Sequence, residues 1–232
     1  MQKIIVDNRM PKIIRDYIKS LGYTVVMLPK QENIYDEISS HVDIFFSKIG
    51  ENLIYSKDVK IEDLDLTKCI EGYKKASGSY PDDTPYNVCI LGKTCVCNLK
   101  NVDKKVMEVL NSCNYSVIEV KQGYTRCSIA KTSENSCITT DRGIYNKLIK
   151  QNIDCLYIEE NNIKLLKNGK ISSMKGFIGG CTALLGNKFI IFGDIDKLES
   201  KEKIKEHINK YNLELIDFKG LEVLDLGGIM EV

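Results

Sequence analysis

The sequence of 232 residues lacks any apolar run that approaches the roughly 18 residues of a membrane span. Its first residues, Met1 to Asp7, also lack the long apolar region of a signal peptide. Neither sign of charge dominates, because 33 Lys and Arg residues oppose 32 Asp and Glu residues and leave a net charge of +1. A nucleic-acid-binding domain normally carries a basic surplus. We therefore expect a cytoplasmic protein whose partner is neither a membrane nor a nucleic acid.

Paired metal-ligand motifs are absent as well. The only histidines are His41 and His207, and none of the nine cysteines forms a Cys-x-x-Cys pair. A zinc site would need thiolates from distant strands, so we expect neither a metal nor another cofactor. The odd number of cysteines, in a chain too long for a small disulfide scaffold, predicts free thiols. Most of them lie in runs rich in Val and Ile, which is typical of small core residues.

What the sequence does contain is a repeat. Four segments share the order strand, polar break, strand, helix and strand, and their Gly-Asn, Glu-Asn and Gly-Lys breaks are typical of short turns between paired strands. The length is about one and a half times that of a typical domain, which fits one domain of repeated units over residues 1–232. The predicted strand pairs are 43–49 with 53–57, 88–91 with 94–97, 127–130 with 136–139, and 177–178 with 188–192.

Apolar residues at helical spacing predict a helix after most of these strand pairs. Ser200 is a suitable N-cap for the last of these helices. That helix is highly charged, so we expect His207, which lies on it, to be exposed to solvent. The predicted helices cover 102–110, 144–149 and 200–211, and they lead into strands at 115–120, 155–158 and 213–218.

The two ends of the chain each hold part of a fifth unit. Residues 3–28 read as strand, helix and strand but lack a first strand, whereas residues 223–232 read as a strand with no helix after it. Pairing of Lys3–Asp7 with Gly228–Val232 would complete the unit and remove an exposed sheet edge. We therefore predict that the two terminal segments lie in one sheet.

Five such units resemble the pentein fold, the β/α propeller of the guanidino-group-modifying enzymes, which include arginine deiminases and dimethylarginine hydrolases. The segment Ser40-His41-Val42-Asp43 is similar to the His-x-Asp opening of a unit in the arginine deiminases. The segment Lys121-Gln122-Gly123-Tyr124-Thr125-Arg126-Cys127 is similar to their glycine-rich segment that ends in Arg-Cys, where Cys is the nucleophile. The resemblance implies an α/β fold of five pseudosymmetric units, circularly permuted, with the ring closed by the terminal strands.

The sequence also departs from the family pattern. Family members open another unit with Glu-Gly-Gly-Asp, and these acids hold the guanidinium group. The matching segment here, Leu226-Gly227-Gly228-Ile229, keeps the glycines and lacks both acids. Asp225 is one residue away, but in a regular strand it would point to the opposite face. The segment Gly179-Gly180-Cys181 lacks an acid too, so we do not expect free arginine to be the substrate.

The resemblance implies covalent catalysis on a small-molecule substrate by a hydrolase or transferase. Cys127 would be the nucleophile, His41 would donate and accept protons, and Asp43, on the same face of its predicted strand, would bind a cationic substrate group. The neighbouring charge of Arg126 would favour the thiolate of Cys127.

Five further residues are candidates for the walls of this pocket. Lys121, Gln122 and Tyr124 precede the cysteine and would line the pocket, or lie in a solvated loop. Asp225 is a candidate substitute for a missing acid, and Cys181 is a second candidate thiol.

Each candidate also has a structural interpretation. Cys127 could be a small core residue and His41 could merely end a loop before a strand. On that interpretation the protein is a non-catalytic ring that binds a ligand or a partner protein, and the absent acids favour it. The sequence leaves open whether the chain forms a homodimer.

Overall fold

Five of the six sheets in the computed structural model, which describes residues 2–232, contain three strands in the same arrangement. In each of the five, the central strand pairs antiparallel with one neighbour and parallel with the other. The five sheets are β3 (Phe46–Ile49), β4 (Asn52–Tyr55) and β5 (Ile70–Glu71); β6 (Cys89–Leu91), β7 (Thr94–Cys97) and β8 (Ser116–Glu119); β9 (Ile129–Ser133), β10 (Ser136–Thr139) and β11 (Asp154–Tyr157); β14 (Thr182–Leu185), β15 (Lys188–Ile191) and β16 (Glu214–Ile216); and β17 (Ile229–Glu231), β1 (Lys3–Asp7) and β2 (Thr24–Leu28). Strands and helices alternate along the chain, so the protein is an α/β protein, as the sequence predicts.

The turns and crossovers of these sheets follow from local sequence. Three of the antiparallel pairs turn at Gly50, Gly92 and Gly186, whose φ angles of 56°, 54° and 57° are accessible to glycine without strain. A parallel pair needs a long crossover, which four of the sheets make with an α-helix. The crossover helices are α1 (Lys12–Ser20), α3 (Lys104–Ser112), α5 (Arg142–Ile149) and α6 (Lys201–Lys210), and the fifth sheet has only the 3₁₀ turn η2 (Leu66–Lys68).

The crossover helices each bury one face, as their apolar spacing predicts. Ile14 and Ile18 of α1 are fully buried, as is Ile204 of α6. The side chains of Asp103 and Asp141 accept hydrogen bonds from backbone N–H groups in the first turns of α3 and α5, which satisfies donors that a helix N-terminus leaves free. The three helices predicted at 102–110, 144–149 and 200–211 are confirmed within a few residues.

The two ends of the chain lie in one sheet. β1 pairs antiparallel with β17, in the register Ile4 with Glu231, Ile5 with Met230 and Val6 with Ile229. The predicted pairing of the terminal segments is therefore confirmed. In the described residues each sheet remains separate, and none closes on itself.

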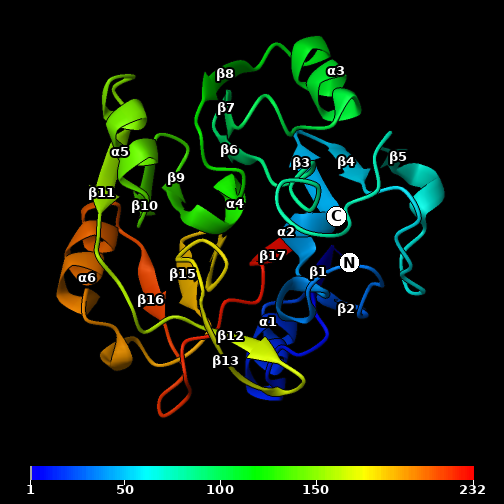
Figure 1. Ribbon diagram of the computed structural model, residues 1–232. Coiled ribbons are helices and arrows are strands. Elements are labelled where there is room, and N and C mark those ends of the chain that lie inside the picture. The colour runs from blue at the N-terminus through cyan, green and yellow to red at the C-terminus, as the bar shows by residue number, and fades with distance from the viewer. Residues whose placement is uncertain (1) are drawn as a thin grey trace.

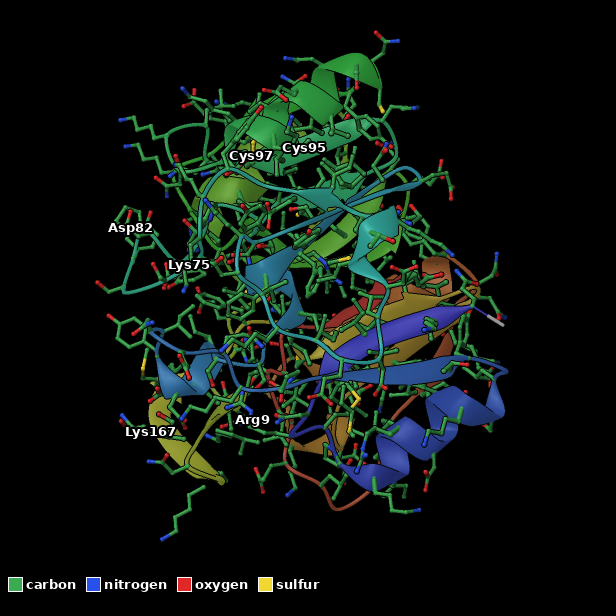
Figure 2. The ribbon with its side chains drawn as sticks, turned by 90° about the vertical axis from the view of Figure 1, so that its right-hand side faces the viewer. Arg9, Lys75, Asp82, Cys95, Cys97 and Lys167 are labelled. Atoms are coloured by element: carbon green, nitrogen blue, oxygen red, sulfur yellow. The ribbon has the colours of Figure 1, made fainter. Side chains whose placement is uncertain are left out.

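The cysteines are free, and seven of the nine are buried. Cys95 and Cys97 lie on β7 in the largest apolar cluster, beneath α3 (Figure 2). The prediction that most of the cysteines are small core residues is confirmed, since six of the nine lie in apolar clusters. No helix in residues 2–232 is long and apolar enough to cross a membrane.

Several local predictions were wrong, among them the strand at 177–178, since the strand that pairs with β15 is β14 at Thr182–Leu185. The strands expected to begin at residues 43 and 127 begin instead with single helical turns, α2 (Val42–Phe45) and α4 (Thr125–Ser128), which lie near the centre of the molecule with the five sheets around them (Figure 1). His207 is only 8 % exposed, because its Nε2 lies 3.0 Å from Ser136 Oγ in the neighbouring sheet. A hairpin, β12 (Lys164–Lys167) with β13 (Lys170–Lys175), was also missed, although its Asn168-Gly169 turn is a strong local hairpin signal.

Candidate active site

The two short helices α2 and α4 bring Asp43 and Cys127 into contact. The Sγ atom of Cys127 lies 2.9 Å from Oδ2 of Asp43 and donates a hydrogen bond to it. Only 2 % of Cys127 and 1 % of Asp43 is exposed. The sequence placed these residues 84 positions apart, and the fold makes them direct neighbours. The site therefore contains a thiol with a carboxylate as its hydrogen-bond acceptor.

Asn87 holds this pair in place. Its Nδ2 donates to the Asp43 carbonyl at 3.0 Å and to Cys127 Sγ at 3.2 Å. Its Oδ1 accepts from the backbone N–H of Arg126 at 2.7 Å, and its carbonyl accepts from Thr125 at 2.7 Å. One amide side chain therefore links α2 to α4. We did not identify Asn87 from the sequence, although it opens the second repeat as His41 opens the first.

Burial is the main influence on the pKa values of Cys127 and Asp43. It raises the pKa of Cys127 well above its usual value, and the negative charges of Asp43 and Asp225 add to this effect. Burial also raises the pKa of Asp43 to about 6, against the lowering effects of its hydrogen bond from Cys127 and the charge of Arg126. The resting thiol is therefore protonated near neutral pH. Arg126 was expected to favour the thiolate by lowering the pKa of Cys127, but in the folded protein burial raises that pKa instead.

His41 lies between two carboxylates at longer range. Its Nε2 is 3.8 Å from Asp7 Oδ2, and its Nδ1 is 3.7 Å from Asp225 Oδ1. The ring is fully buried, and within residues 2–232 neither of its nitrogens has a hydrogen-bond partner. Burial lowers the pKa of His41, although both carboxylates oppose this effect. The imidazole is therefore neutral and is free to accept a proton. Because residue 41 precedes a helical turn, the strand-face argument that paired it with Asp43 was wrong.

Asp225 points into the site, contrary to what a regular strand would give. Its Oδ2 accepts from the Phe177 N–H at 2.8 Å and its Oδ1 from the Gly227 N–H at 3.1 Å. Gly227 and Gly228 have φ angles of 68° and 65°, so the backbone here is not extended. Gly180 packs against the carboxylate so closely that a Cβ on it would lie 1.9 Å from Oδ1. Burial raises the pKa of Asp225.

Asp7 is a further site residue that the sequence analysis missed. It is completely buried, and its carboxylate accepts hydrogen bonds from the backbone and the guanidinium of Arg9. The same guanidinium donates to the carbonyls of Glu37 and of Leu166 on the β12–β13 hairpin. Figure 2 shows Arg9 between the terminal sheet and the hairpin that carries Lys167. The position of Asp7 at the end of a terminal strand is the only signal the sequence offers for it.

The remaining predicted residues divide between the wall and the surroundings of the site. Tyr124 packs its ring against Phe177, whose N–H binds Asp225, at 6.0 Å and donates to buried Asp83, so it belongs to the wall of the site. Lys121 is exposed, and Gln122 bonds to Asp141 and to the Tyr124 N–H, so neither belongs to the cluster.

Arg126 and Cys181 lie beside the cluster and not in it. Arg126 is half-buried, and its Nη1 donates to the Gly179 carbonyl at 3.3 Å. Cys181 donates to the Ile178 carbonyl within an apolar cluster, and burial raises its pKa, so it is a core thiol. Within residues 2–232 no three His, Cys, Asp or Glu side chains are grouped so that they could hold a metal ion.

The fold resembles that of two kinds of guanidino-group-modifying enzyme. A cysteine variant of dimethylarginine dimethylaminohydrolase from Pseudomonas aeruginosa, complexed with citrulline, aligns over 100 % of this chain and 99 % of its own, with a TM-score of 0.58 and 10 % identity. A histidine variant of a dimethylarginine dimethylaminohydrolase, in an adduct with S-methyl-L-thiocitrulline, aligns over 93 % and 91 % with a TM-score of 0.57 and 10 % identity. Agmatine deiminase from C. jejuni aligns over 92 % and 74 % with a TM-score of 0.52 and 10 % identity. The chain therefore has the fold of these enzymes.

The family to which the chain belongs follows from a match of its sequence to a family model. A model described as a family of unknown function, DUF6873, matches residues 5–230, and the chain belongs to that family. No curated protein matches the sequence.

Proposed function

We propose that this protein is a cysteine-dependent hydrolase or transferase that acts on the amidinium or guanidinium group of a small molecule. The observation that carries the proposal is the 2.9 Å contact between Cys127 Sγ and Asp43 Oδ2, within a buried cluster that also contains His41 and Asp225. A nucleophile in contact with a proton acceptor, with a neutral imidazole nearby, is the arrangement that nucleophilic catalysis requires.

The arrangement of the sheets supports a five-unit propeller for this enzyme. A cavity near the centre of the molecule is lined by residues from β3, β6, β9, β14 and β17, which is one strand from each three-stranded sheet. Five strands around one cavity are what a ring of five units would provide. In this proposal the β1–β17 pair closes the ring, and the chain is circularly permuted relative to the arginine deiminases.

The electrostatics favour a cationic substrate. Asp43 and Asp225 are both buried, and each carries a raised pKa because burial disfavours its charge. Asp7 is already neutralised by Arg9, so these two carboxylates are the ones available to a ligand. A bound amidinium would supply the missing positive charge, and it would also favour the thiolate of Cys127. The positive charge of the substrate would then both attract it to the two carboxylates and favour the reactive thiolate of Cys127.

The chemical steps follow from this geometry. The proton of Cys127 moves to Asp43, and the sulfur forms a bond to the amidinium carbon. The bond from that carbon to one nitrogen breaks, and the departing amine takes the proton from Asp43. A water molecule then attacks the carbon of the thiouronium or thioimidate intermediate while His41 accepts one of its protons. The carbon–sulfur bond breaks, Cys127 takes the proton back from His41, and the remaining hydroxyl proton passes from the product to the released amine. One water is consumed, and the products are a urea or amide and a protonated amine.

The substrate proposed here is not free arginine or agmatine. Gly179 and Gly180 supply no acid, and Gly180 is too close to Asp225 for any side chain to replace it. The rings of Tyr80 and Phe177 flank Tyr124 at 5.7 and 6.0 Å, and this aromatic group in the wall of the site leaves little room for a long substrate. A smaller amidine is the better match.

A second candidate is a ring that binds a ligand without catalysis. The observation that favours it is the burial of Cys127 together with its raised pKa, both of which suppress thiol reactivity. The two candidates differ in the behaviour of the thiol when a cation is bound beside it.

Alkylation with matched reagents separates them. We would treat the protein with 2-chloroacetamidine, which is cationic, and with 2-chloroacetamide, which is neutral and of the same shape, and follow each cysteine by peptide mass spectrometry. For Cys127 we expect at least a tenfold preference for the cationic reagent, because Asp43 and Asp225 would hold its amidinium. Asp225→Asn should remove most of that preference.

The controls use the other thiols of the same chain. Cys181→Ala should leave the preference at Cys127 unchanged, because Cys181 lies outside the cluster. Cys127→Ser should abolish hydrolysis of any amidine or amide found to be a substrate, while the melting temperature stays nearly the same. Equal rates with the two reagents, or a cysteine other than Cys127 as the preferred target, would leave only the binding ring.

A further inference from the structure

The cavity lined by one strand of each three-stranded sheet is a second feature at the centre of the molecule. It has a volume of about 220 Å³. A water molecule takes about 30 Å³ of liquid, so a group the size of a phosphate fits with room for part of a larger molecule. Its walls come from β3, β6, β9, β14 and β17, the inner strands of the five sheets, and from Arg126, which precedes Cys127. Cys127, Asp43, His41 and Asp225 do not line it, so the cavity is a separate space that adjoins the candidate active site at Arg126.

Three cationic side chains line this cavity. Lys48 comes from β3, Lys131 from β9 and Arg126 from α4. Glu231 of β17 is the one acidic residue among the lining residues, and its carboxylate accepts a hydrogen bond from Gln2. The lining therefore carries a net charge of +2, in a chain whose total net charge is +1.

These cations lack carboxylate partners in the part of the chain that the structure describes. Within residues 2–232, no carboxylate oxygen lies within 4.0 Å of the charged nitrogens of Lys48, Lys131 or Arg126. Arg126 is half-buried, and its one side-chain hydrogen bond is to a neutral carbonyl, that of Gly179. Most other half-buried charged groups of this protein are paired, as Arg9 is with Asp7. A guanidinium with unused donors beside a cavity is suited to an oxyanion.

Two of the cations, Arg126 and Lys131, lie near the same residue of the cavity wall, Cys89. Cys89 lines the cavity, and the charges of Arg126 and Lys131 both lower the pKa of this thiol, while burial raises it to about 11. The positive charges of Arg126 on α4 and Lys131 on β9 therefore both lie close to Cys89.

We propose that this cavity binds a small molecule through an anionic group, a phosphate or a carboxylate, held by Arg126, Lys131 and Lys48. The site does not use Cys127, and it stands whether or not the protein is a hydrolase.

Calorimetric titration of the full chain tests the proposal. The probes are inorganic phosphate and citrate, added at constant ionic strength with chloride as the balancing anion. We expect saturable binding of at least one of them. Lys131→Gln and Lys48→Gln should each weaken it at least tenfold, because each removes one charge-assisted contact. Glu231→Gln should strengthen it several-fold, because it removes the only negative charge of the lining.

Two controls make the outcome specific. Lys203→Gln changes an exposed lysine of the crossover helix α6, which contributes no residue to the cavity, and should leave binding unchanged. Cys127→Ala should also leave binding unchanged, so failure of the proposed catalytic function and failure of this site are distinguishable. Absence of saturable binding for both probes, or equal binding by the Lys48→Gln Lys131→Gln double variant, would overturn the proposal.

Discussion

At the scale of single residues, Asp43 has the largest influence on the charge of the candidate site. It accepts the hydrogen bond of Cys127, it raises the pKa of that thiol, and its own carboxyl has a pKa of about 6 in place of 3.8. Its Oδ1 also lacks a hydrogen-bond partner within residues 2–232. A buried carboxyl group with a raised pKa and an oxygen that lacks a hydrogen-bond partner reduces the stability of the folded state whenever it is ionised.

The change of the free energy of unfolding with pH measures how much the ionised Asp43 reduces stability. The folded protein binds the Asp43 proton more tightly than the unfolded chain does, so stability falls as the pH rises from about 4 to about 6 and the effect is constant above that. A shift of about two pKa units corresponds to about 3 kcal/mol. Relative to Asp43→Asn, the parent should therefore lose up to about 3 kcal/mol between pH 4 and pH 7, measured by urea unfolding.

His41 is present in both proteins, so the difference between their stability curves reports Asp43 together with the effect of its charge on the pKa of Asp225. The lowered pKa of His41 acts in the opposite direction, reducing stability as the pH falls below about 6.5, and it contributes almost equally to the parent and the variant. Asp82→Asn, which makes the same substitution at an exposed position (Figure 2), is the control. A parent and an Asp43→Asn variant with parallel stability curves would show that Asp43 carries no such strain.

At the scale of elements, the short helices α2 and α4 and the turn at Gly227–Gly228 bring the site together. Each interrupts or precedes an inner strand and turns a polar side chain toward the centre: Asp43 from α2, Cys127 from α4 and Asp225 from the turn. The strands that follow begin with buried apolar residues, Phe46, Ile129 and Ile229, and these residues fix the turns that precede them. The terminal strand β17 has the same role for Asp225, which lies four residues before it.

Removal of β17 should therefore damage the whole fold. Deleting residues 229–232 strips the backbone pairing with β1 and exposes the partners of Ile229 and Met230, both 7 % exposed. Burial of a large apolar side chain is worth about 1.5–3 kcal/mol, so we expect a loss of several kcal/mol in urea unfolding. Ile171→Ala, at a position that is 54 % exposed on β13, should change stability by less than about 0.5 kcal/mol. A truncated chain with the unfolding midpoint of the parent would contradict a structural role for the terminal sheet.

At the scale of the whole molecule, the N- and C-terminal segments are neighbours in one sheet. Val232 donates from its backbone N–H to the Lys3 carbonyl at 2.9 Å, and Gln2 donates from its side chain to Glu231 at 2.8 Å. The two ends could therefore be joined, and new ends made elsewhere, without changing how the sheets pack.

A circular permutant tests this directly. A short glycine-rich linker would join the two ends, and the new ends would open the exposed Asn168-Gly169 turn between β12 and β13. Chain termini at exposed turns are well tolerated, so the permutant should keep the parent's circular dichroism spectrum and a melting temperature within a few degrees. A matched permutant opened between Ile138 and Thr139, inside β10, should lose most of its stability because it breaks a buried strand. Equal behaviour of the two permutants would argue against this interpretation.

The sequence by itself determined the repeated units, the crossover helices, the free cysteines and the pairing of the terminal segments. These features follow from the alternation of apolar residues and from local turn chemistry, both of which can be read along the chain. It also indicated His41, Asp43 and Cys127 as candidate residues, from two motifs that resemble those of known enzymes.

Only the tertiary structure decided how these residues meet. Helical turns at 42–45 and 125–128, in place of the predicted strands, turned Cys127 toward Asp43 and left His41 beside Asp7 and Asp225. Asn87 joined the site because it precedes the inner strand β6, and Asp7 joined it because β1, antiparallel to β17, ends beside the start of β17. No local pattern encodes either position. The pKa values of Cys127 and Asp43 were also decided at this level, since burial is the main cause of both and depends on the whole fold.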